Sequence, residues 1–419
     1  MIKLIEKIEG EAKLNFNFKD NKIDFVDIEF MSTRNIENIL KGKSAFDALV
    51  INPRVCGICG HAHLIATVQA LENCYDNLEL SNKAKIIREL TLNFELIQNH
   101  FKWYYLTMLP LFGQKQQVLK ATYPSQLMGK AIALFGGQYP HTSYAIVGGV
   151  VCEITEMDII KLQHYIAQTI KFVEDNLVKI DSENFLTCKD ADTLLDYEGD
   201  LPDILRQIKK EKLLKYGKSY DRFISFGENS YFKKGKSLKT KVSHNISIEH
   251  VKESEMPSSF AKNVSFKDKY YEVGPLARAM VNKTPLIADA HKKYGDSIFS
   301  RILARVCEIS QLLEHSKKLI KDLDLSEPSY IEPSLDISQL SASGYSAVEA
   351  ARGTLIHKVE IEDGMIKNYE IITPTQWNLS GGTKDKQGVS QKAMIGLSDI
   401  KTAELVFKSF DVCSVCTTH

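Results

Sequence analysis

Two cysteine pairs near opposite ends of this 419-residue sequence could bind a metal ion. Cys56 and Cys59 stand in "RVCGICGHAH", and Cys413 and Cys416 stand in "DVCSVCTTH". A C-x2-C turn can direct two thiolates at one ion, so the two turns together could supply four sulfurs. Small zinc modules usually keep their two pairs close in sequence, whereas here nearly the whole chain separates them. The site would therefore join the two ends of the fold.

The chemistry of four thiolates suits zinc or a redox-active late transition metal. Taken alone, the two pairs favour a structural zinc site over nickel. Eight cysteines in a chain of this length are too few for a disulfide scaffold. The four cysteines outside the pairs lie in apolar or helical contexts and are predicted to be small buried side chains: Cys74, Cys152, Cys188 and Cys307.

The composition is that of a globular protein with a large core in two or three subdomains. Apolar residues make up 44% and charged residues 25%, with zero formal net charge, so no basic excess favours nucleic acid. No apolar run approaches the roughly 18 to 20 residues that cross a bilayer. The opening "MIKLIEKIEGEAK" lacks the apolar stretch of a signal peptide, and a cytoplasmic location is predicted.

The elements that must position the cysteines are mainly helical. Apolar residues recur at three- and four-residue steps over 159–173 and 298–313, and 82–109 forms a third helical stretch whose aromatic cluster "HFKWYY" is predicted to pack in the core. β-Hairpins are predicted where "AKLNFNFKDNKIDFVDIEF" turns through "KDNK" and at Asp363-Gly364. The fold class is α+β: a central helical bundle with peripheral β-hairpins and small sheets, and terminal segments that converge on a buried metal site.

The chain divides into six predicted segments. Residues 181–265 are lysine-rich and less regular, so they are expected to form an irregular surface excursion. The others are a β-rich N-terminal segment (1–55), a helical core in two parts (56–180 and 266–325), a β-hairpin segment (326–375) and a C-terminal closure of the metal site (376–419).

Three further motifs make the chain resemble the large, catalytic subunit of a nickel–iron hydrogenase over nearly its whole length. "KIEGEAKL" resembles the family's R-I-E-G-H-L opening, "RVCGICGHAH" matches R-x-C-G-x-C-x3-H, and "DVCSVCTTH" resembles the D-P-C-x2-C-x2-H terminus. "YEVGPLAR" (271–278) and "VEAARG" (348–353) resemble two internal signatures. Five motifs in the family's order favour nickel over zinc.

The resemblance implies a nickel–iron centre whose iron carries one carbon monoxide and two cyanides. All four cysteines would bind nickel, with Cys56 and Cys413 as terminal ligands and Cys59 and Cys416 as bridges to the iron. The implied activity is heterolytic cleavage of H2 into protons and electrons, reversible but with oxidation favoured.

The same resemblance assigns roles to single residues around the metals. Heterolysis needs a metal position open to hydrogen and a nearby base. Cys413 would be the first base, and Glu9 of "KIEG" would take the proton next. Arg352 of "VEAARG" would overhang the open position, with Asp411 as its neighbour. His63 would donate a hydrogen bond to a bridging sulfur.

A second ion is implied near the C-terminus. Glu37 and the terminal His419 match residues that help hold Mg²⁺ in relatives; iron or another divalent ion is the alternative, because histidine is an unusual magnesium ligand. Ending at His419, the chain would be a mature form or a member that needs no cleavage. Departures from the family pattern leave oxygen tolerance and catalytic direction open: Glu11 for histidine, Asn35 for glycine, Trp103 for histidine, Leu111 for aspartate, and Ala351 and Val412 for proline.

Electron transfer implies a partner. With four cysteines used as ligands, none remain in iron–sulfur spacing, so a small subunit with iron–sulfur clusters must carry the electrons. A higher oligomer or a membrane-associated electron-acceptor complex is compatible with this. A regulatory hydrogen sensor is the alternative function. The related respiratory complex I subunit is disfavoured, because it has lost the metal whereas this chain keeps all four cysteines.

Overall fold

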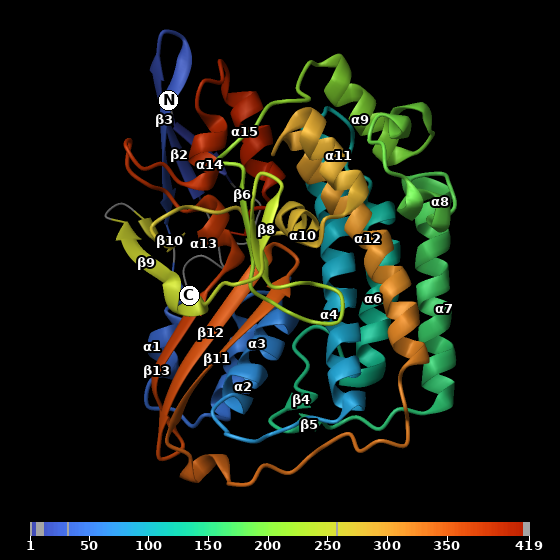
Figure 1. Ribbon diagram of the computed structural model, residues 1–419, viewed down its shortest axis with the longest axis vertical. Coiled ribbons are helices and arrows are strands. Elements are labelled where there is room, and N and C mark those ends of the chain that lie inside the picture. Colours follow the sequence, from blue (N-terminus) through green and yellow to red (C-terminus); the bar gives the residue numbers. More distant parts are fainter. Residues whose placement is uncertain (1, 6–11, 32, 257–258, 414–419) are drawn as a thin grey trace.

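A bundle of four long helices forms one side of the molecule, at the right of Figure 1, and most of the sheets lie at the left. The computed structural model describes residues 2–5, 12–31, 33–256 and 259–413. Side chains cap the N-termini of three bundle helices, where Ser81, Thr155 and Ser297 each accept a backbone hydrogen bond. The bundle consists of α4 (Asn82–Lys102), α6 (Val118–Gly136), α7 (Glu156–Phe172) and α12 (Ile298–Lys321).

The three helical stretches expected from apolar periodicity correspond to α4, α7 and α12. Beyond α4 the chain continues as a π-helix, η2 (Trp103–Met108), and then α5 (Leu109–Leu111). The aromatic cluster at this junction is buried, which confirms that it packs in the core: Phe101, Trp103, Tyr104 and Tyr105.

Two antiparallel sheets contain the predicted hairpins. Their turns, Asp20-Asn21 and Asp363-Gly364, have φ values of 50°, 56°, 48° and 72°, the left-handed region that two-residue hairpin turns require. The sheets are β1 (Ile2–Ile5), β2 (Ala12–Lys19) and β3 (Lys22–Phe30), and β11 (Ala342–Ala350), β12 (Gly353–Glu362) and β13 (Met365–Ile372). Both predicted hairpins are therefore confirmed.

Helix α3 (Gly60–Glu72) connects the bundle to the second sheet. It packs against β11 and β12 on one side and against α4 on the other. From the C-terminal side, α15 (Ile400–Ser409) packs against α12 and returns the chain toward the start of α3. Segments from both ends of the sequence thus lie next to the bundle.

The expectation of an irregular excursion at 181–265 was wrong in its details. This stretch contains two helices and two small sheets: α8 (Ser182–Thr187), α9 (Asp200–Lys210), β6 (Arg222–Ser225), β7 (Gly235–Leu238), β8 (Lys241–Ser243), β9 (Val251–Met256) and β10 (Ser259–Phe266). One face of α9 is buried through Leu201, Ile204, Leu205 and Ile208. Most of the lysines that suggested a solvated segment are exposed, and Lys234 and Lys236 are half-buried.

Shorter elements complete the chain. They are α1 (Ile36–Leu40), α2 (Asp47–Ile51), η1 (Asn52–Arg54), β4 (Ala145–Ile146), β5 (Gly149–Val150), η3 (Val173–Leu177), η4 (Thr193–Asp196), η5 (Ile248–His250), α10 (Pro275–Asn282), α11 (Pro285–Tyr294), η6 (Ile337–Gln339), α13 (Pro374–Leu379) and α14 (Val389–Met394).

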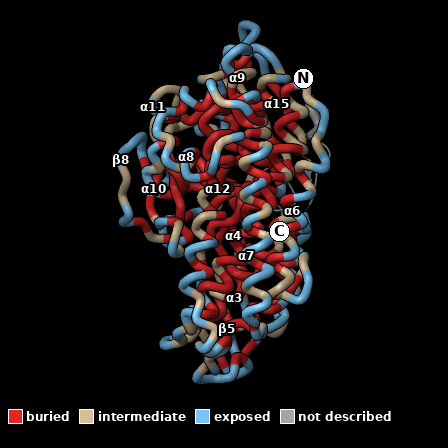
Figure 2. Tube along the Cα trace, turned by 90° about the vertical axis from the view of Figure 1, so that its right-hand side faces the viewer, coloured by how far each residue is buried: buried red, intermediate tan, exposed pale blue. Residues whose placement is uncertain are grey.

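Buried residues run through the interior along the length of the bundle, and exposed residues form its outer surface (Figure 2). Four cysteines were expected to be buried, and Cys74 and Cys307 are buried. The other two, Cys152 and Cys188, are only partly buried, because each follows the end of a short element. Within the described ranges, no helix combines the length and apolar character needed to cross a membrane.

Candidate metal centre

Three of the four predicted cysteine ligands meet in one buried cluster. Cys56 and Cys59 lie in the turn between η1 and α3, and Cys413 follows α15. The Sγ atoms of Cys56 and Cys413 are 3.7 Å apart, although the two residues are 357 positions apart in sequence. All three sulfurs lie within 4.8 Å of one another, and among the described residues no other group of His, Cys, Asp and Glu side chains comes together in this way. Cys416 lies outside the described residues.

The turn that carries Cys56 and Cys59 is held from the side by α4. Helix α3 begins without a side-chain cap of its own, and the two carboxylate oxygens of Glu95 accept hydrogen bonds from the amides of His61 and Ala62, both at 2.9 Å. Burial raises the pKa of Glu95 to about 7, although these amides act to lower it. Asn99, one turn further along α4, donates to the carbonyl of Ile58 at 3.0 Å.

A glycine is required at the start of α3. The Cβ of any larger residue at position 60 would overlap the carbonyl oxygen of Pro53, which belongs to η1. The "CGICG" turn can therefore pass close to the preceding backbone only because its last residue is glycine.

Arg352 reaches this cluster from the turn between β11 and β12. It is buried, and its Nη2 lies 3.2 Å from Oδ1 of Asp411, the neighbour expected for it. Burial by itself lowers the pKa of Arg352, but Asp411 and the three thiols together raise that pKa well above its ordinary value. The guanidinium therefore carries a permanent positive charge beside the sulfurs.

A small cavity lies between this guanidinium and the cysteine turn. It is lined by Cys59, His63, Ala350, Arg352, Leu355, Pro374 and Thr375. Two further nitrogens of Arg352, Nε and Nη1, are buried and have no hydrogen-bond partner among the described residues. Unpaired buried donors are costly, so this arrangement fits a bound group that accepts hydrogen bonds.

His63 also lines the cavity and is oriented by a buried polar chain. Its Nδ1 lies 3.0 Å from Nε2 of His357, whose Nδ1 is 2.8 Å from the hydroxyl of Tyr369. Thr67 donates to the carbonyl of His63 at 2.7 Å and contacts the same hydroxyl at 3.3 Å. These contacts fix the plane of the His63 ring at the edge of the cavity.

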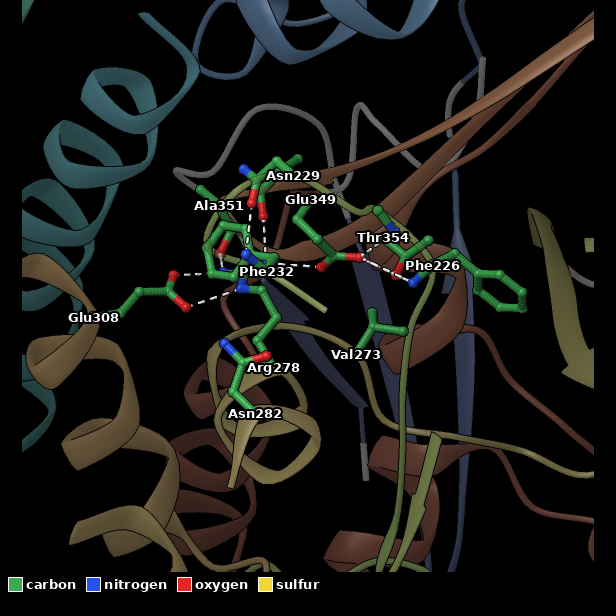
Figure 3. A network of polar contacts seen from close by, with 12 residues as sticks. Phe226, Asn229, Phe232, Val273, Arg278, Asn282, Glu308, Glu349, Ala351 and Thr354 are labelled. Carbon is green, nitrogen blue, oxygen red and sulfur yellow. Dashed lines mark hydrogen bonds and ion pairs between the residues drawn. The ribbon is translucent and has the colours of Figure 1, made fainter. Parts of the chain in front are cut away.

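The motif "YEVGPLAR" supports the backbone that carries Arg352. Arg278 pairs with Glu308 and Glu349 (Figure 3). It also donates to the carbonyl of Ala350 at 2.8 Å. Gly274, with a φ of 108°, lets α10 approach the carbonyl of Arg352, which a Cβ would meet at 2.8 Å. The motif therefore positions the backbone on which Arg352 lies.

Glu37, the described residue of the pair predicted to hold a second ion, lines a separate polar cavity of about 360 Å³. Glu37 accepts a hydrogen bond from the amide of Ile371 at 2.8 Å, and Nζ of Lys262 lies 3.4 Å from Glu37 and 3.6 Å from Glu253. Gln376 donates to Glu253 at 3.0 Å. Two carboxylates suit a hard cation, but a lysine already shares them.

Several residues that support the site were missed by the sequence-based interpretation, and three predicted ones, Glu9, Cys416 and His419, are not among the described residues. Glu95, Arg305 and His357 lie within apolar helix or strand patterns, where a charged or polar side chain is the only signal. Glu9 and His419 lie outside the described residues, so their predicted roles stay predictions.

Comparison with known proteins identifies the family. A family model described as nickel-dependent hydrogenase matches residues 34–111 and 221–419. The chain is 27% identical to the periplasmic [NiFeSe] hydrogenase large subunit of Desulfomicrobium baculatum, covering 99% of this chain and 93% of that protein. It is 23% identical to sulfhydrogenase 1 subunit alpha of Pyrococcus furiosus, covering 99% and 96%.

Solved structures show the same fold. The oxidised Ni-Fe-Se hydrogenase of D. vulgaris Hildenborough superposes with a TM-score of 0.86 at 22% identity, covering 100% of both chains. The reduced, active form of the Desulfomicrobium baculatum enzyme gives 0.82, covering 98% of both. This chain therefore belongs to the nickel-dependent hydrogenase family, whose members are oxidoreductases acting on hydrogen, and it corresponds to the large subunit.

Proposed function

We propose that this chain cleaves H2 heterolytically at a nickel–iron centre and favours oxidation. The observation that carries the proposal is the buried cluster of Cys56, Cys59 and Cys413 beneath Arg352, with two guanidinium nitrogens that lack a partner among the described residues. In this proposal Cys56, Cys59, Cys413 and Cys416 would hold the centre through their sulfurs, and its iron would carry one carbon monoxide and two cyanides. Such a centre supplies an open metal position that polarises hydrogen.

The surrounding residues would move the proton and hold the charge. Sγ of Cys413 would accept the proton, because a thiolate beside a permanent positive charge is a weak enough base to pass it on. Glu9 would receive it next. Arg352 would donate from Nε and Nη1 to the diatomic groups, and Asp411 would fix its orientation through Nη2. His63 would tune a bridging sulfur.

We further propose that Glu37 and His419 hold a divalent ion, Mg²⁺ or iron, in the polar cavity. The support is the pair of carboxylates, Glu37 and Glu253, the kind of ligand that a hard cation prefers, in a cavity that three glutamates and three lysines line. The ion would tie the C-terminal segment to α1.

The electron route requires a partner with iron–sulfur clusters. The described cysteines outside the centre are scattered and form no cluster with other ligand side chains. A heterodimer with an iron–sulfur small subunit is therefore proposed, alone or within a larger or membrane-associated complex. The predicted cytoplasmic location stays a prediction, since one relative is named as periplasmic.

The test is metal analysis with infrared spectroscopy on the protein purified with its partner. We expect nickel and iron in equal amounts, and bands for one carbon monoxide and two cyanides. Cys413→Ala should abolish nickel binding, because it removes a sulfur from the cluster. Cys307→Ala, a buried cysteine in α12 away from the cluster, is the matched control and should keep the metals. Stoichiometric zinc without these bands would contradict the proposal.

A further inference from the structure

A second buried arginine reaches the metal centre from the bundle. Arg305 lies in α12, and its Nη1 is 2.9 Å from Oδ2 of Asp411. The other carboxylate oxygen, Oδ1, contacts Arg352. Asp411 is therefore held between two guanidinium groups, and all three side chains are buried. Two positive charges face one negative charge immediately beside the cysteine cluster.

Three further contacts fix the orientation of Arg305. Its guanidinium carbon lies 4.6 Å from the centre of the Trp103 ring, a cation–π arrangement. Its Nη1 also lies 3.0 Å from Nδ1 of His100 and 3.3 Å from the carbonyl of Ala351. The carbonyl contact ties Arg305 to the residue directly before Arg352. Trp103 stands where the family pattern has histidine, so this departure supplies the stacking surface.

His100 must be neutral and in one tautomer to make these contacts. Its Nε2 lies 2.8 Å from Glu308, so this nitrogen carries the hydrogen that the carboxylate accepts. Nδ1 is then the acceptor that faces Arg305. Burial lowers the pKa of His100 to about 4, which agrees with the neutral form. Glu308 pairs in turn with Arg278, which also pairs with Glu349, so Arg305 and Arg352 are the two guanidinium groups in direct contact with Asp411.

We propose that Arg305 is a positioning residue of the metal centre, one that orients Arg352 through Asp411 and adds a second positive charge to the site. The inference rests on the proposed function, because it assumes that the centre is bound at the cysteines. Arg305 makes no contact with the reacting atoms; it acts through Asp411. A buried positive charge favours the electron-rich states of a thiolate centre, so its removal shifts the midpoint potential to more negative values.

The experiment compares Arg305→Gln and Arg305→Lys with wild type, in the complex with the partner subunit. Infrared-monitored redox titration reports the bands and the midpoint potential. Arg305→Gln should shift the bands, lower the potential and slow hydrogen–deuterium exchange by up to about a hundredfold. Arg305→Lys keeps the charge but loses the planar fork, so it should restore the potential more fully than the exchange rate.

Arg301→Lys is the matched control. Arg301 lies one turn away on α12, is equally buried and stacks on the Phe410 ring at 3.8 Å, but its ion pair is with Glu272. The infrared bands and the midpoint potential of Arg301→Lys should stay at wild-type values. Arg305→Gln with unchanged bands and potential would overturn the proposal. If Arg305→Gln binds no nickel, the two lysine variants decide. Equal shifts of the infrared bands and the midpoint potential in Arg305→Lys and Arg301→Lys would then overturn the proposal. Absence of the bands from wild type would instead reject the proposed function.

Discussion

At the residue scale, the permanent charge of Arg352 is the feature that distinguishes this cluster from a plain cysteine site. A structural zinc site is satisfied by its four ligands and needs no buried cation above it. Here the guanidinium of Arg352 lines the cavity and pairs with Asp411, and its Nε and Nη1 atoms find no hydrogen-bond partner in the part of the chain that the structure describes. The arrangement therefore indicates a group that carries its own hydrogen-bond acceptors.

Glu9 is the proton carrier that the sequence motif assigns. Glu9→Gln keeps the shape of the side chain and removes its titratable proton, so metal assembly should be normal while hydrogen–deuterium exchange falls by a factor of about a hundred or more. Nickel analysis and gas-phase isotope exchange would measure the two effects separately. Glu6→Gln, a neighbouring carboxylate outside the "IEG" motif, is the control and should exchange at the wild-type rate. Hydrogen–deuterium exchange at the wild-type rate in Glu9→Gln would show that Glu9 does not carry the proton.

At the element scale, α3 depends on α4 for its N-terminal cap. The first amides of a helix need acceptors, and Glu95 supplies both of its oxygens to His61 and Ala62. Because a carboxylate at this end also favours the helix dipole, the contact stabilises the turn that bears the cysteines. The packing of two helices thus sets the position of two metal ligands.

The raised pKa of Glu95 predicts a pH dependence of stability. The pKa of Glu95 is about 7 in the folded chain and near 4.5 in the unfolded chain. Between these two pH values the folded chain therefore retains a proton on Glu95 that the unfolded chain has lost. The free energy of unfolding should therefore fall as pH rises through this window, relative to Glu95→Gln, by about 1.4 kcal/mol per pH unit. Urea unfolding of the chain at several pH values measures it. Glu183→Gln, at an exposed position in α8, should follow wild type; parallel curves for all three proteins would contradict the prediction.

At the scale of the whole molecule, the metal site closes the fold. The cysteine turn before α3 and the segment after α15 are brought together by α12, which packs against α4 and α15. Metal binding and the docking of the C-terminal segment should therefore be coupled, since the ligands come from both ends of the chain.

The C-terminal residues beyond Cys413 test this coupling. Cys416→Ala should yield protein without a stable binuclear site, because a bridging sulfur binds both metals. His419→Ala leaves all four sulfurs, so partial assembly with weakened association of the small subunit is expected. Metal content and size-exclusion chromatography of the complex would measure both. Full nickel and iron in both variants would show that this segment does not carry ligands.

The sequence determined the chemistry of the site and the main elements. Motifs identified five residues of the site, because a metal centre demands particular side chains at particular spacings: Cys56, Cys59, Arg352, Asp411 and Cys413. The hairpins and bundle helices were predicted because apolar periodicity and left-handed turn residues are local properties.

Only the tertiary structure decided which residues support that chemistry. Three such residues, Glu95, Arg305 and His357, each lie within an apolar pattern. The partners that tie them to the site, Ala62, Asp411 and His63, lie 33, 106 and 294 positions away along the chain. The buried elements of 181–265 were missed because their exposed lysines dominate the composition. A buried polar side chain becomes meaningful only when its partner is known, and that partner is selected by the packing of distant elements, which local sequence does not encode.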